Sequence, residues 1–156
     1  MTPTPLDRTP ANDRPARRRV AAALTLGCLA VVSFQAALTL GAPLGAAAFG
    51  GMNGGTLPDD LRLVTAFATV AWLGAALIVL ARGGFAISPL PRAVAQWGTW
   101  LLVCFLALAT LLNFASSSPW ERFGWGPFSV TMLILCVILV RTDVKTPRGQ
   151  PHPDGA

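Results

Sequence analysis

The chain has 156 residues, enough for one domain, and 53% of them are hydrophobic. Charged residues make up 12%, about half the fraction found in soluble domains, and the formal charge of +5 comes from eleven Arg and one Lys against seven acids. The basic residues stand in short segments between apolar runs, which is typical of membrane orientation and argues against a nucleic-acid-binding surface.

The two ends of the sequence carry little that a folded core would bury. Residues 1–19 contain four prolines and finish in three consecutive arginines, and residues 142–156 are similarly polar. This composition predicts a disordered basic N-terminal tail and a disordered C-terminal tail.

Four apolar segments lie between the tails. About 20 apolar residues cross a hydrocarbon core of about 30 Å, so each segment is interpreted as a transmembrane helix. A signal peptide is the alternative for the first segment, but its apolar stretch is long and no convincing cleavage site follows it. The expected spans are residues 20–42, 63–81, 93–115 and 119–141.

The fourth span needs more than its apolar run, because Phe128–Val140 is too short to cross alone. Ser118 to Glu121 has the signature of a helix start, with Ser at the N-cap, Pro in the first turn and Glu completing a capping box. Pro127 then falls inside the helix and cannot donate to a carbonyl, so a kink is predicted there. The alternative is a short interfacial helix followed by a separate tilted span.

The distribution of basic residues predicts the orientation. With four spans, ten Lys and Arg residues lie on one side, and only Arg62 and Arg122 lie on the other. The positive-inside rule then places both termini in the cytoplasm. The predicted fold is all-α, a transmembrane four-helix bundle over residues 20–141 with N-in/C-in topology, in a bacterial cytoplasmic membrane. Four tryptophans near the span ends are expected as interface anchors, namely Trp97, Trp100, Trp120 and Trp125.

Polar and small residues recur every three or four positions in the spans and predict the inward faces of the bundle, with Leu, Ile and Val outward. Whether these stripes serve only packing or line a ligand path stays open. The stripes are Thr25, Cys28, Val32, Gln35 and Thr39; Thr65, Thr69 and Trp72; Gln96, Thr99, Val103, Thr110, Asn113 and Ser117; and Ser129, Met132 and Cys136.

A polar cluster is expected at the outer boundary of the spans. Arg62 is unusual there, because a cation in the first turn of a helix opposes the helix dipole, and Glu121 is its expected ion-pair partner. Two interpretations remain open: a network that fixes the outer loop, or a shallow pocket that opens outward. The cluster comprises Gln35, Arg62, Asn113, Glu121 and Arg122.

The sequence lacks the residues that several kinds of chemistry require. The three cysteines lie far apart in apolar spans without a CxxC motif and are interpreted as buried structural thiols, and the single histidine, His152, is in the C-terminal tail. No metal site and no cofactor are therefore predicted. No ionisable residue lies deep in a span, which argues against a proton-coupled transporter.

Particular motifs carry a resemblance to a family. They are LGAPLG after the first span, FGG and LPDDLR in the outer loop, and NFASSSPWERFGWGP before the last span. Over residues 20–141 the chain resembles a group of small bacterial four-span membrane proteins with no established activity. The resemblance implies a four-span membrane protein with a motif-bearing outer surface.

Two functions are expected from these observations. The leading one is non-catalytic: a scaffold or accessory subunit in the lipid bilayer that contacts a membrane protein partner or a second copy of itself. The alternative is binding or transport of a small neutral or zwitterionic solute at the outer cluster. An enzyme is not expected, since Glu121 is the only credible acid–base residue. A cavity that reaches Gln35 would favour the alternative, whereas a sealed bundle with Arg62 joined to Glu121 would favour the scaffold.

Overall fold

The structure is a computed structural model that describes residues 13–88 and 90–142, and every regular element in these ranges is helical. Four helices are long and apolar enough to cross a membrane, over Arg14–Thr39, Asp59–Gly83, Arg92–Ala115 and Glu121–Arg141. This confirms the all-helical prediction and the number of candidate spans. The elements are α1 (Asp13–Thr39), η2 (Gly45–Ala47), η3 (Phe49–Gly51), α2 (Asp59–Gly83), α3 (Arg92–Ala115), η4 (Glu121–Trp125) and α4 (Gly126–Arg141).

The predicted N-terminal tail is too long. Helix α1 begins at Asp13, so residues 13–19 are helical. Pro15 in the first turn and the strong helix propensity of the arginines explain the earlier start. The remainder of that tail, residues 1–12, and residues 143–156 lie outside the described residues.

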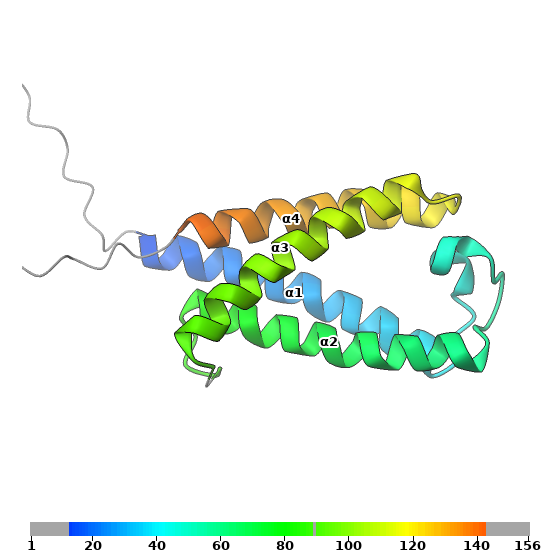
Figure 1. The fold of residues 1–156 in the computed structure, drawn as a ribbon, viewed down its shortest axis with the longest axis horizontal. Coiled ribbons are helices and arrows are strands. Elements are labelled where there is room, and N and C mark those ends of the chain that lie inside the picture. Colours follow the sequence, from blue (N-terminus) through cyan, green and yellow to red (C-terminus); the bar gives the residue numbers. More distant parts are fainter. Residues whose placement is uncertain (1–12, 89, 143–156) are drawn as a thin grey trace, which may run out of the picture.

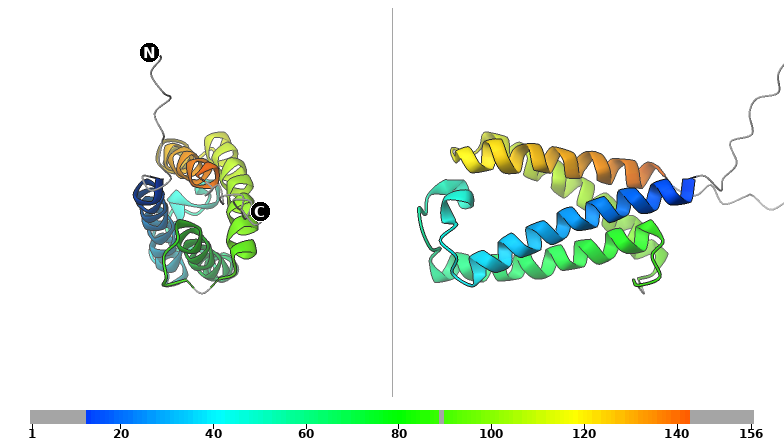
Figure 2. Two further views of the ribbon diagram at one scale, coloured as in Figure 1. Left: turned by 90° about the vertical axis from the view of Figure 1, so that its left-hand side faces the viewer. Right: turned by 180° about the vertical axis from the view of Figure 1, so that it is seen from behind.

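The four helices form two antiparallel pairs, α1 with α2 and α3 with α4 (Figures 1 and 2). At the end where α1 begins and α4 ends, here called the terminal end, the two pairs lie together. Toward the opposite end they diverge, and the long loop of residues 40–58 folds back there together with the 116–125 segment (Figure 1). This second end is called the loop end.

The apolar core lies in the half of the bundle nearer the terminal end. Gly27 lets α1 approach α4 closely, because a Cβ at this position would collide with the sulfur of Met132. Close approach through small residues is the usual packing of helices in lipid. The buried core residues are Ala21, Leu24, Cys28, Ala76, Val79, Leu102, Leu106, Met132, Cys136 and Leu139.

Most of the predicted inward stripes are buried or half-buried, and Thr25, Thr65, Thr99 and Ser129 are among the buried residues. Three predictions are wrong. Ser117 is exposed, beyond the end of α3, and its hydroxyl donates to Gly50 O of the long loop. Gln96 is exposed, because Ala95, four residues before Thr99, occupies the inward position of that turn. Cys104 is also exposed, unlike the other two cysteines.

An arginine closes the C-terminal end of each of α1, α2, α3 and α4. Helix C-termini carry unpaired carbonyls and partial negative charge, and a guanidinium satisfies both. The four bonds run from Arg62 Nε to Thr39 O (3.0 Å), Arg18 Nη2 to Gly84 O (3.0 Å), Arg122 Nη2 to Ser116 O (2.8 Å) and Arg82 Nη2 to Val140 O (3.3 Å).

The start of α4 confirms an irregularity near Pro127 but corrects its form. The helix runs without a break from Glu121 to Arg141, and residues 121–125 form a π-turn in which Gly126 N–H donates to the carbonyl of Glu121. Pro127 comes directly after this turn. The proline has no N–H to donate, and it lies where the regular α-helical hydrogen-bond pattern is already interrupted. The described backbone therefore agrees with the continuous helix and not with two separate segments.

Candidate ligand cavity beneath the long loop

The long loop has a defined fold. Gly45 N–H donates to Gly55 O at 2.9 Å and closes the loop on itself, while Ala48 and Leu57 pack with Leu38 in a small apolar cluster. Gly50 and Gly51 follow with φ of 74° and 73°, values that favour glycine. Phe49 has a φ of 51°, a conformation that costs free energy in a residue with a side chain, so its surroundings must hold it in place.

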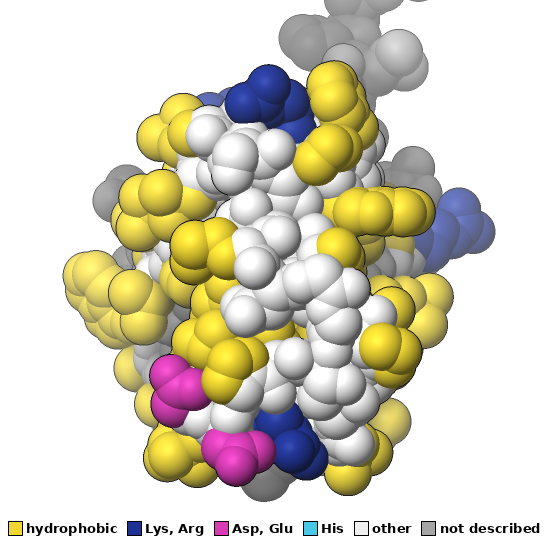
Figure 3. Space-filling view, turned by 90° about the vertical axis from the view of Figure 1, so that its right-hand side faces the viewer, with side chains coloured by type: hydrophobic (Ala, Val, Ile, Leu, Met, Phe, Trp, Pro, Cys, Tyr) yellow, Lys and Arg dark blue, Asp and Glu magenta, His cyan; other side chains and the backbone are white. Residues whose placement is uncertain are grey.

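Four hydrogen bonds attach the loop to the 116–125 segment. Together they span residues 46–50 of the loop, which is thereby held across the loop end of the bundle (Figure 1). The face seen from this end is mainly backbone and uncharged polar side chains in its middle, with hydrophobic side chains around the rim (Figure 3). The bonds are Gly50 N to Glu121 Oε1 (2.9 Å), Ser117 Oγ to Gly50 O (3.1 Å), Ser118 Oγ to Ala46 O (2.8 Å) and Trp125 Nε1 to Ala47 O (3.1 Å).

These bonds overturn one prediction. The capping box is absent, because Ser118 and Glu121 use their side-chain oxygens on the long loop and not on their own helix. The ring of Trp125 is half-buried and packs 4.7 Å from the ring of Phe34 and 5.5 Å from that of Phe128, whereas Trp97, Trp100 and Trp120 are exposed. The anchor role of all four tryptophans stays a prediction.

A cavity of about 220 Å³ lies beneath the loop, between the diverging helix pairs. Its walls combine residues of all four helices with residues 47–49 of the loop. Most of the wall is apolar and much of it aromatic, from Phe34, Phe49, Trp72, Phe105, Trp125 and Phe128. Four polar residues interrupt this surface, namely Gln35, Asn113, Glu121 and Ser129.

The polar residues of the cavity differ in their partners. Asn113 Nδ2 donates to Ser129 Oγ at 2.9 Å, and Ser129 Oγ donates to Trp125 O at 2.7 Å, so this pair is internally satisfied. Glu121 accepts from the backbone of Gly50. Gln35 Oε1 is buried and has no hydrogen-bond partner within the described part of the chain. Gln35, in the wall of the cavity, therefore holds a buried acceptor without a partner, which its neighbours close off from solvent.

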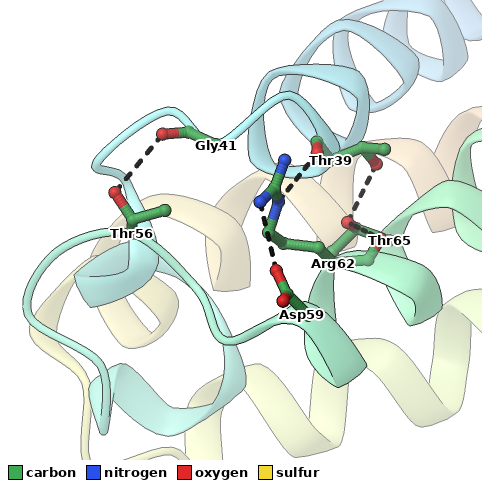
Figure 4. A network of polar contacts seen from close by, with 6 residues as sticks. All are labelled: Thr39, Gly41, Thr56, Asp59, Arg62 and Thr65. Atoms are coloured by element: carbon green, nitrogen blue, oxygen red, sulfur yellow. Dashed lines mark hydrogen bonds and ion pairs between the residues drawn. The ribbon is translucent and has the colours of Figure 1, made fainter.

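Arg62 lies outside the cavity, and its predicted ion pair with Glu121 is wrong. Its guanidinium lies 3.3 Å from Asp59 Oδ1 and donates to Thr39 O, while Thr39 and Thr65 share a hydroxyl–hydroxyl bond of 2.9 Å (Figure 4). The Arg62 guanidinium is unfavourable near the N-terminus of its own helix, α2. Here it interacts favourably with the negative C-terminal end of the neighbouring helix α1. Asp59 is 98% exposed, so the bond to Thr39 O is the more effective of the two contacts.

Arg122 is exposed and lies outside the cavity as well, with its guanidinium on the carbonyl of Ser116. Of the five residues in the predicted cluster, the structure thus brings together Gln35, Asn113 and Glu121 around one space. Arg62 and Arg122 instead donate hydrogen bonds to carbonyls at helix C-termini.

Two apolar grooves flank the cavity and share its aromatic walls. One, of about 560 Å³, borders α1 and the start of α4 and shares Phe34, Trp125 and Phe128. The other, of about 370 Å³, lies between α2 and α3 and shares Trp72 and Phe105, whose rings meet edge-on at 5.7 Å. Aromatic pairs therefore separate the cavity from both grooves.

Sequence reasoning found Trp72 through its inward stripe but missed the other aromatic walls. Phe49 and Gly50 had a signal in the FGG motif, yet a loop has no periodicity that would indicate where its side chains point. Phe34 and Phe128 read as ordinary span residues, because an aromatic residue in an apolar run is equally suited to lipid, core or cavity.

Fold and site define the class: an all-helical chain with four helices apolar enough to cross a membrane and a loop-covered cavity between two helix pairs. Comparison with protein-family models, curated proteins and solved structures gives no match to this chain.

Proposed function

We propose that this chain is a multi-pass protein of a bacterial cytoplasmic membrane, with both termini in the cytoplasm, that binds a small neutral or zwitterionic solute in the cavity beneath its outer loop. Four apolar helices and the ten-to-two distribution of basic residues support the location and the orientation. The observation that carries the binding function is the free buried oxygen of Gln35 in an aromatic-walled cavity.

A buried acceptor without a partner costs about 1–3 kcal/mol, which a hydrogen-bond donor on a ligand would recover. Asn113 and Ser129, in the wall of the same cavity, are hydrogen-bonded to each other, and neither has a buried polar atom without a partner. The cavity therefore suits a ligand that places one donor near Gln35 and an apolar body against the aromatic rings, as small-molecule sites commonly do.

The cavity volume limits the size of the ligand. At about 220 Å³ it exceeds the roughly 150 Å³ that accepts benzene and lies below the roughly 300 Å³ at which sites for drug-sized ligands begin. A compact solute fits these limits, and a large substrate does not.

Ligand-induced stabilisation of the purified full chain in detergent tests the proposal. A panel of small neutral and zwitterionic solutes is added at increasing concentration, and a true ligand raises the unfolding free energy by about 2.7 kcal/mol at 100 times its Kd. Gln35→Met should abolish the effect, whereas the matched variant Gln96→Met, at an exposed position of α3, should retain it. A panel without any stabilising member would contradict the proposal.

Orientation has its own test. A reporter fused to the C-terminus should score as cytoplasmic in a bacterial host, as should one fused to the N-terminus. An external score for either terminus would place an odd number of crossings in the chain or reverse the bundle.

A scaffold or accessory subunit is the second candidate. The observation in its favour is that Arg62, Arg122 and Ser118 are all engaged in fixing helix ends or the loop. Copurification from the native membrane with protein and lipid mass spectrometry separates the two functions. A stoichiometric protein partner with no small molecule retained would favour the scaffold.

A further inference from the structure

The carboxylate of Glu121 brings an unbalanced negative charge to the cavity. It is half-buried, lines the cavity and accepts one hydrogen bond, from Gly50 N–H. Within residues 13–88 and 90–142 the ion pair formed by an acid is that of Asp59 with Arg62, on the other helix pair. Arg122, next in the chain, is exposed and bonds a carbonyl of the α3 terminus. No cation of the described chain therefore compensates Glu121.

The walls around this carboxylate attract cations of a particular kind. The faces of aromatic rings carry negative quadrupole potential and bind substituted ammonium groups, with Trp the strongest. Trp72 and Trp125 both line the cavity together with four phenylalanines. A metal ion would instead need several carboxylate, imidazole or thiolate ligands, and no three such residues gather in the described ranges.

We propose that the solute bound in this cavity carries a substituted ammonium group, placed between Glu121 and the aromatic rings. The inference rests on the proposed binding function and adds the class of ligand: a zwitterion or a cation that carries this group, and not a neutral solute. A donor elsewhere on the compound, such as a hydroxyl, bonds Gln35 Oε1. The ammonium group comes either from a free solute or from a phospholipid headgroup, whose acyl chains the flanking apolar grooves would accept.

The test compares choline with 3,3-dimethyl-1-butanol, a neutral compound of the same shape in which carbon replaces the charged nitrogen. Binding to the purified full chain in detergent is followed by tryptophan fluorescence, since two tryptophans line the cavity. Choline should bind at least about tenfold more tightly than its neutral isostere, the factor that 1.4 kcal/mol of cation recognition gives. This comparison uses the native chain and needs no variant.

Variants locate the effect. Glu121→Gln keeps an oxygen for Gly50 N–H but removes the charge, and should weaken choline binding at least about tenfold while leaving the neutral isostere unchanged. Asp60→Asn removes an exposed charge near the start of α2 and should leave the preference for choline intact. A loss of that preference in Asp60→Asn would instead indicate nonspecific surface charge and overturn the assignment to Glu121.

The outcomes distinguish the inference from the function beneath it. If the neutral isostere binds as tightly as choline, or if other solutes of the panel bind while choline does not, the ammonium inference fails and the binding function stands. If neither compound nor any member of the panel binds, both fail. Nanodiscs assign the source: suppression of choline binding by phosphatidylcholine but not by phosphatidylglycerol supports a lipid headgroup, and equal binding in both supports a free ammonium solute.

Discussion

Replacing Gln35 by methionine should raise the stability of the protein while it removes ligand binding. The Gln35 side chain makes no hydrogen bond within the described residues, and its Oε1 is buried, so the substitution breaks no hydrogen bond. An unsatisfied buried acceptor costs about 1–3 kcal/mol. We expect a gain near 1 kcal/mol, at the low end, because the side chain is only partly buried and borders the cavity. Methionine has a similar length and keeps the wall filled.

Thermal unfolding of the purified protein in detergent measures this gain. For a chain of this size, 1 kcal/mol corresponds to a rise in Tm of about 2–4 °C. The matched control, Gln96→Met, changes an exposed amide on α3 and should stay within about 0.5 kcal/mol of the parent chain. A loss of more than about 1 kcal/mol in Gln35→Met would mean that the amide has a stabilising partner, and the argument for a free acceptor would be refuted.

Three further substitutions test the loop end by the same unfolding measurement. Gly51→Ala should cost more than about 1 kcal/mol, since its φ is 73° and a Cβ would crowd the side chain of Ser118, whereas Gly54→Ala has open space and should be nearly neutral. Arg62→Gln and Glu121→Gln should add within about 0.5 kcal/mol when combined, because the residues share no contact; strong coupling would restore their pairing. Thr65→Val should cost about 1–2 kcal/mol through two lost hydroxyl bonds at a fully buried site, and a neutral result would exclude those bonds.

The helices were predictable because apolar length is a strong signal and requires no knowledge of neighbours. The expected third span, 93–115, agrees with α3 to within one residue. The start of α1 was placed seven residues too late, because residues 13–19 are polar and lie beyond the apolar run although they still form helix. Helix α2 begins at Asp59, in agreement with the expectation that Arg62 lies in the first turn of a helix. Hydropathy indicates which segment can be buried in lipid. A helix can continue into polar residues beyond that segment, and hydropathy does not reveal how far.

Partner choice at the loop end could not be predicted. Charge and position suggested Glu121 for Arg62, but the structure gives Arg62 the carbonyl end of α1 and gives Glu121 a backbone N–H of the long loop. Both choices involve backbone groups, which every residue possesses and which sequence therefore does not distinguish. The basic residues that topology counting treats as orientation signals have the same second use: Arg18 and Arg82 also bond carbonyls at helix ends.

Different interactions hold the two helix pairs together at the two ends of the bundle. At the terminal end the two helix pairs are joined by packed apolar side chains such as Leu24, Val79 and Leu139. At the loop end they are joined by the ring contact of Phe34 with Trp125 and by a few hydrogen bonds such as that of Gly50 with Glu121, each worth about 0.5–1.5 kcal/mol. Separating the pairs at the loop end would therefore cost less free energy than unpacking the core, and would expose the cavity beneath the long loop.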